Sequence, residues 1–135
     1  KRLAWAADPP PTPWSSRMCT AVRIVVAAAE RERRLELRRA AVTAEWEVVG
    51  EAADANAAYV EAVERRARFL VLDASAAGPR PEALVRRLRS TSPNAFVVGV
   101  GEVAGADACV DAAALDGLRD AMRDLLHSSG DHQHA

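Results

Sequence analysis

The sequence predicts an α/β fold, with one domain built on a parallel sheet of five strands that are connected and followed by four helices. Two observations lead to this prediction. Apolar runs of strand length alternate with longer segments whose apolar residues recur at helical spacing, which is typical of parallel strand–helix units. The 135 residues, half of them hydrophobic, are also enough for one domain with a substantial core and too few for two.

The first half of the pattern gives three strands and two helices. Val22–Ala27 (VRIVVA) is the first buried strand, Glu47–Ala52 is a short second one, and Phe69–Asp73 (FLVLD) is the third and most continuously apolar. Helices are expected over Glu30–Val42 and Asn56–Arg66. The first helix interleaves arginine with glutamate, which favours a solvated, salt-bridged face over a basic recognition surface. Its apolar residues, expected to face the sheet, are Leu35, Leu37, Ala41 and Val42.

The second half of the pattern gives two helices and two strands. Pro81 suits the first turn of a helix, where no amide donor is needed, and this helix is expected to end near Ser90. Strands follow at Phe96–Val100 and Ala108–Val110. Apolar residues at three- and four-residue steps then predict a final amphipathic helix over about Ala113–Leu126.

The connection between the last two strands is unusually short. From Gly101 to Asp107 only seven residues are available, whereas a parallel crossover that contains a helix needs about a dozen or more. The helix between strands four and five is therefore expected to be reduced or missing. The alternative is that the last short strand is not paired in this way.

Both ends of the chain differ in composition from the middle. Residues 1–20 form a tail rich in proline, which fixes φ and removes amide donors. Residues 128–135 are polar and are expected to be disordered. The folded domain is therefore expected to span residues 21–127.

Charge and cysteine content argue against several classes of function. Eighteen basic and nineteen acidic residues leave a net charge of −1, so no long-range field draws the chain to nucleic acid or to an anionic membrane. We expect no direct nucleic-acid contact by this domain. No apolar run is long enough to cross a membrane and no signal peptide is recognisable, so we expect a cytoplasmic protein. Cys19 and Cys109 form no metal-binding pattern and are expected to be free thiols.

An ordered set of segments resembles a known family. The segments are Arg23–Val26, Glu47–Ala52, Phe69–Asp73, Leu84–Arg89 and Ala104–Asp107. In order and spacing they are similar to the receiver domain of bacterial two-component response regulators. The resemblance covers residues 21–127 and implies a flavodoxin-like, doubly wound parallel sheet with strand order 2-1-3-4-5. It also implies a functional site at the carboxyl ends of the strands.

A working receiver needs several groups around its phosphate-accepting aspartate. Two acidic residues after the first strand hold Mg²⁺ with that aspartate, and a hydroxyl residue after strand four and a lysine after strand five bind the phosphoryl oxygens. In this chain Asp73 alone matches. The degenerate positions are Ala28 and Ala29 for the acidic pair, Gly101 for the hydroxyl, and Asp111 or Ala112 for the lysine. Because alanine cannot ligate Mg²⁺ and the lysine charge is missing, we expect Asp73 to be inactive as a phosphoacceptor, with no metal and no other cofactor.

Two further roles for the acidic residues stay open. One is a displaced metal site, although the charge of Glu30 is also explained by the dipole at a helix start. Its members would be Glu30, Asp73, Glu102 and Asp111. The other is structural, because a carboxylate at a strand end accepts hydrogen bonds from loop amides such as those after Ser75. No Walker sequence is present and no histidine lies near Ser75, so we expect no enzymatic activity.

The sequence therefore predicts a non-catalytic, phosphorylation-independent module of signal transduction or transcription regulation. It would bind a protein partner, a second copy of itself as a homodimer, or both. The alternative is a phosphoacceptor or small-ligand sensor that uses Asp73. The contact surface is expected near the gap left by the missing helix, although ordinary core packing also explains the same residues. These residues are Val103, Cys109, Val110, Leu118, Met122 and Leu125.

Overall fold

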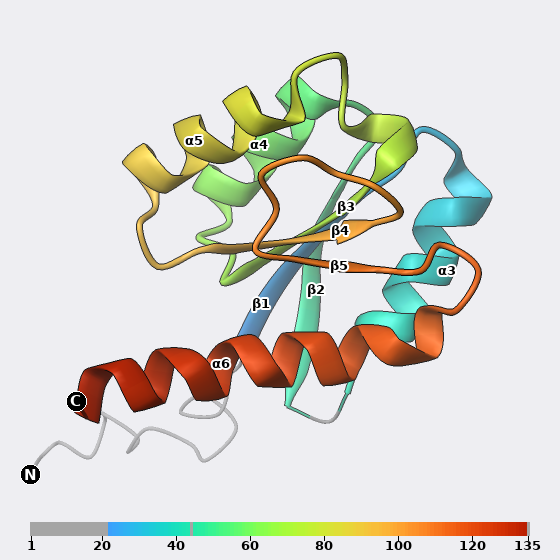
Figure 1. The fold of residues 1–135 in the computed structure, drawn as a ribbon. Coiled ribbons are helices and arrows are strands. Elements are labelled where there is room, and N and C mark those ends of the chain that lie inside the picture. The colour runs from blue at the N-terminus through green and yellow to red at the C-terminus, as the bar shows by residue number, and fades with distance from the viewer. Residues whose placement is uncertain (1–21, 44, 135) are drawn as a thin grey trace, which may run out of the picture.

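The computed structural model of the chain describes residues 22–43 and 45–134, with side chains as far as residue 128. Its strands form one parallel sheet in the order β2-β1-β3-β4-β5 (Figure 1). The strands are β1 (Val22–Ala27), β2 (Trp46–Ala52), β3 (Phe69–Asp73), β4 (Phe96–Val100) and β5 (Ala108–Val110). The predicted fold class and strand order are confirmed.

Helices cover both faces of this sheet within the described part of the chain (Figure 1). Two of them, α4 and α5, pack on one face, and α3 and α6 pack on the other. The elements are α3 (Arg31–Ala41), α4 (Ala55–Glu64), α5 (Pro81–Thr91) and α6 (Leu118–His134), with single 3-10 turns η1 (Ala74–Ala76) and η2 (Leu115–Gly117). The sheet is thus the middle layer of three.

Local sequence explains where two of the helices begin. The Asp54 side chain accepts a hydrogen bond from the Ala57 amide at 2.8 Å and satisfies one of the free amides at the start of α4. Pro81 is the first residue of α5, where its missing amide removes no hydrogen bond. Helix α5 begins at its predicted residue, Pro81. Helix α4 begins at Ala55, one residue before its predicted start at Asn56.

The sheet has an apolar layer on each face, and β3 contributes to both. Leu70 and Leu72 belong to the layer beneath α4 and α5, whereas Phe69 and Val71 belong to the layer beneath α3 and α6. All four side chains are fully buried, and each contributes roughly 1.5–3 kcal/mol by leaving water. A slip of one residue would exchange the two layers, so packing fixes the register of β3 and with it the position of Asp73.

The connection between β4 and β5 contains no helix, as the sequence predicts. Val103 in this connection is buried against the sheet, directly over Gly99, where a Cβ atom would lie only 2.7 Å from the Val103 Cβ. The Asp107 amide donates to the Val97 carbonyl at 2.8 Å, and the Asp107 side chain accepts from the Val97 amide at 2.7 Å. Arg89 of α5 forms an ion pair with Asp107. Strand β5 is paired with β4, so the alternative of an unpaired last strand is wrong.

The final helix differs from the prediction at both ends. It begins at Leu118, after η2, and not near Ala113. Asp111 forms a local turn there instead, because its side chain accepts from the Ala113 amide at 2.9 Å and its carbonyl accepts from the Ala114 amide at 3.0 Å. At the other end the backbone is helical as far as His134, through the tail for which the sequence predicts disorder.

Helix α3 turns a narrower apolar face to the sheet than the sequence suggests. Leu37 and Ala41 are fully buried, as predicted. Leu35 and Val42 are exposed, with 36% and 39% of their surface accessible. Residues two apart on a helix point in nearly opposite directions, so Leu35 cannot share the face of Leu37, and Val42 lies beyond the last helical residue.

Two expectations from the sequence concern the ends and the thiols of the chain. Cys109 is an exposed free thiol. Cys19 and the proline-rich tail 1–20 lie outside the described residues. Among the described residues, no helix combines the length and apolar character needed to cross a membrane.

Candidate functional site

Asp73 ends β3, and both oxygens of its buried carboxylate accept hydrogen bonds. Oδ2 accepts from the Ser75 amide at 3.1 Å and from the Ser75 hydroxyl at 2.5 Å, which makes Asp73 the N-cap of η1. Oδ1 accepts from the Nε–H group of Arg33 at 3.2 Å. The carboxylate is therefore bound by the loop after its own strand and by a helix from elsewhere in the chain.

Arg33 joins three elements through one guanidinium group. Its Nε bonds to Asp73, while a terminal nitrogen donates to the Ala112 carbonyl at 2.6 Å and the other donates to Glu36 Oε1 at 3.1 Å. Partial burial acts against the charged form, but the hydrogen bonds and charges of Glu36 and Asp73 outweigh it, so the pKa of Arg33 is raised above its ordinary value. This side chain is a permanent positive charge at the carboxyl end of the sheet.

The acidic pair of the resemblance is replaced by two alanines that the backbone holds in place. Ala28 is fully buried, and Ala29 is exposed but donates its amide to Ser75 Oγ at 3.1 Å. Arg34 donates to the Ala28 carbonyl at 2.9 Å and to the Ala29 carbonyl at 3.4 Å. The loop after β1 is thus bound to the loop after β3 and to α3, and it carries no carboxylate toward Asp73.

The other two positions given by the resemblance, Gly101 and Asp111, serve the backbone. Gly101 has φ +89°, a conformation that favours glycine over serine or threonine, and its amide donates to the Val110 carbonyl at 2.8 Å. Asp111 is exposed, and its carboxylate accepts from the Ala113 amide. Neither side chain position offers the hydroxyl or the cation that phosphoryl binding needs.

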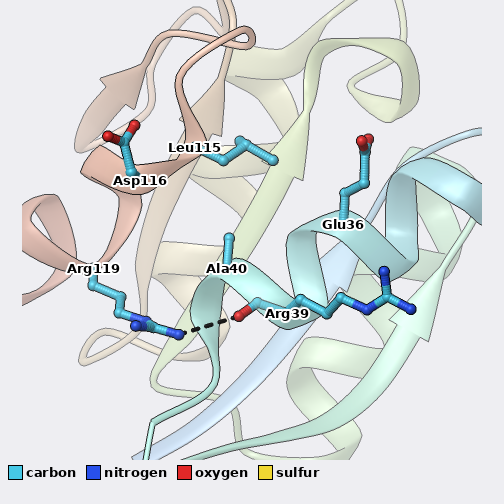
Figure 2. A pocket seen from close by; sticks show the side chains of 6 residues that line it. All are labelled: Glu36, Arg39, Ala40, Leu115, Asp116 and Arg119. Atoms are coloured by element: carbon cyan, nitrogen blue, oxygen red, sulfur yellow. Dashed lines mark hydrogen bonds between the residues drawn. The ribbon is translucent and has the colours of Figure 1, made fainter.

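A hollow of about 440 Å³ lies beside this site, between α3 and the η2–α6 segment. Figure 2 shows Leu115 pointing across it toward α3, and Arg119 reaching the Arg39 carbonyl, to which it donates at 3.2 Å. Charged side chains of both signs and two apolar side chains line the hollow. The residues that line it are Glu36, Arg39, Ala40, Leu115, Asp116 and Arg119. This hollow could not be predicted from the sequence, because it forms between segments that lie some eighty residues apart in the chain.

The residues predicted to form a contact surface separate into two groups. Val103, Leu118 and Met122 are buried in the core, so they do not offer surface to a partner. Of the others, Cys109 is exposed, and Val110 and Leu125 are half-buried. The accessible part of the predicted surface is therefore small and centres on the edge strand β5.

The fold is that of a response-regulator receiver domain. The two-component response regulator of the LuxR family from Aurantimonas sp. SI85-9A1 matches with a TM-score of 0.68 and 24% identity, over 80% of this chain and 86% of that one. The CheY-like receiver domain protein from Methanospirillum hungatei JF-1 matches with a TM-score of 0.67 and 15% identity, over 83% and 98% of the two chains.

A third solved structure with this fold comes from a complex. A chain of the complex between CheY6 and the P1 domain of CheA3 from R. sphaeroides matches with a TM-score of 0.64 and 18% identity, over 80% of this chain and 98% of that one. No protein-family model matches the sequence, and no curated protein is significantly similar to it. These likenesses establish the fold, and the chemistry of the site rests on its own residues.

The residues of this site do not fit the Mg²⁺ ion that a working receiver holds. Asp73 already accepts hydrogen bonds on both oxygens, and the neighbouring positions carry methyl groups. Glu30 and Glu102 are exposed. In the described part of the chain, no group of three or more His, Cys, Asp or Glu side chains is placed to hold a metal ion, so the displaced metal site is not assembled.

Sequence reasoning missed Arg33, the residue that defines this site. The arginines of the first helix were expected to lie on a solvated, salt-bridged face. That holds for Arg38, which pairs with Glu51 at 3.1 Å with half of its side chain exposed. Arg33 instead lies in the first turn of α3, beside the carboxyl end of β3. Its place in the first helical turn after the first strand was the available signal.

Proposed function

We propose that this chain is a receiver-like regulatory module that works without phosphorylation and without catalysis, by contact with another protein or with a second copy of itself. One observation carries the proposal. Both oxygens of Asp73 accept hydrogen bonds from within the chain, and one of the donors is a guanidinium group that stays protonated throughout the physiological pH range.

Phosphoryl transfer makes demands that this arrangement does not meet. The attacking oxygen must be free to approach phosphorus, and a cation must offset the charge that develops on the transferred group. Here the carboxylate is engaged by Arg33 and Ser75, and the positions of the acidic pair are Ala28 and Ala29. Ser75 is bonded to a carboxylate but has no histidine beside it in the sequence, which argues against its use as a nucleophile.

Contact with proteins fits both the fold and the surface. CheY6, a chain of the same fold, was solved together with the P1 domain of CheA3, so a domain of this architecture binds another protein. In this chain the hollow between α3 and η2 and the edge of β5 present charged and apolar side chains together. Surfaces of mixed character are typical of regulated protein contacts.

The test is an attempt to phosphorylate the chain. The protein is incubated with Mg²⁺ and either acetyl phosphate or beryllofluoride, and its intact mass and backbone amide spectrum are recorded. We expect no added phosphoryl mass and no shift of the amides around Asp73. An increase in mass that disappears in the Asp73→Asn variant would overturn the proposal and favour the alternative, a phosphoacceptor or small-ligand sensor that uses Asp73.

A further inference from the structure

The charge that faces Asp73 comes from an unexpected element. The resemblance places a cation in the loop after β5, at Asp111 or Ala112, and none is present there. The guanidinium of Arg33, on α3, reaches both the Asp73 carboxylate and the Ala112 carbonyl. We propose that the Arg33 guanidinium takes the place of a bound cation beside Asp73. By bonding to both Asp73 and Ala112, it forms a latch that holds residues 111–117 to α3.

The shape of the guanidinium group gives this bridge its strength. The group is planar and rigid, and its five N–H donors point in fixed directions. Donors toward Asp73, Ala112 and Glu36 are therefore satisfied in one orientation of the side chain. If the Asp73 acceptor is lost, this orientation loses its charged anchor, and the bond to the neutral Ala112 carbonyl is weakened with it.

The latch contacts both sides of the hollow. On the α3 wall, Arg33 forms an ion pair with Glu36, which lines the hollow. On the other wall, Ala112 lies in the turn that leads into η2, whose Leu115 and Asp116 also line the hollow. Release of Arg33 would therefore move both walls together. In this way the loss of the hydrogen bond between Arg33 and Asp73 would alter a surface that a partner can contact.

The experiment uses nitrogen-15 NMR on the full chain, with the Nε–H signal of Arg33 as the direct readout. In the Asp73→Ala variant we expect this proton to exchange with water roughly tenfold faster, as for the loss of one charge-assisted hydrogen bond. We also expect the backbone amides of residues 111–117 to shift. Arg33→Met should shift the same amides, and the double variant should shift them no further.

Two further variants keep the test decisive. Arg38→Met removes an exposed arginine from the same helix and should leave residues 111–117 unchanged. Arg33→Lys keeps the charge but lacks the forked donors of the guanidinium group. The amide signals of residues 111–117 should therefore shift part of the way toward their positions in the Arg33→Met spectrum. This milder variant is used if the others fail to fold. Unchanged amides at 111–117 in both Arg33 variants, or additive shifts in the double variant, would overturn the latch.

This inference deepens the proposed function and rests on it, but the two fail differently. Phosphorylation of Asp73 in the wild-type chain would end the proposed function while leaving the NMR coupling intact. If the Arg33 Nε–H proton exchanges at the same rate in the Asp73→Ala variant as in the wild-type chain, the latch is ruled out, and the result with acetyl phosphate is unaffected.

Discussion

Arg33 and Asp73 form an ion pair in which Arg33 Nε lies 3.2 Å from Asp73 Oδ1, with 22% and 10% of the two side chains exposed. The pair closes the carboxyl end of the sheet with groups that belong to the chain itself. A buried carboxylate is costly without a partner, so this guanidinium has a structural role.

Removal of the arginine should destabilise the fold. In the Arg33→Met variant, Asp73 keeps the Ser75 donors but loses its countercharge, and we expect the free energy of unfolding to fall by about 1–3 kcal/mol. Urea denaturation measures this. Arg38→Met is the matched control, since its pair with Glu51 is exposed, and it should change stability by less than about 1 kcal/mol. Equal losses in the two variants would show that the pair with Asp73 has no special weight.

The serine beside the aspartate should contribute less. Ser75→Ala removes the hydroxyl that donates to Asp73 at 2.5 Å and accepts from the Ala29 amide at 3.1 Å, but it keeps the backbone donor to Asp73. We expect a loss of about 1 kcal/mol in the same denaturation assay. Ser90→Ala, on the exposed side of α5, is the control and should have little effect. A loss for Ser75→Ala as large as that for Arg33→Met would contradict this order.

The short connection after β4 should be intolerant of added volume. In Gly99→Ala the new Cβ would lie 2.7 Å from the Val103 Cβ, and we expect a loss of about 1–3 kcal/mol measured by thermal or urea unfolding. Gly117→Ala is the control, because nothing lies within 4 Å of its Cβ position. Combining Gly99→Ala with Val103→Gly, which removes the clashing Cβ, should recover part of the loss. Simple addition of the two losses would show that Val103 does not fill the place of the missing helix.

A homodimer through the β5 edge remains our prediction for the free protein. Light scattering over a range of concentrations should show self-association, because β5 is an edge strand and Cys109 on it is exposed. Cys109→Arg should abolish the dimer, whereas Ala53→Arg, an exposed position beyond β2, should not. A monomer at every concentration, or equal effects of the two substitutions, would rule out this interface.

Periodicity in the sequence was enough to predict most elements, because strand and helix patterns are local. The predicted ranges for β1, β3, β4 and β5 agree with the structure residue for residue. The start of α6 was misplaced, because the hydrogen bonds of Asp111 favour a turn that an apolar repeat does not reveal. The side of α3 that carries Leu35 was also misassigned, since spacing by two does not fit a helical face.

What the sequence determined by itself was which chemical groups the side chains can offer. The side chains of Ala28, Ala29 and Gly101 carry no oxygen in any conformation, so these positions of the resemblance offer no carboxylate or hydroxyl, and this follows from residue identity alone. What only the tertiary structure decided was which of several arginines meets Asp73, a residue forty positions further along the chain than Arg33. That choice depends on which residues of α3 lie beside the end of β3 once the two segments have packed, and the alternating charges of the helix do not encode it, because the contact exists only in the folded chain.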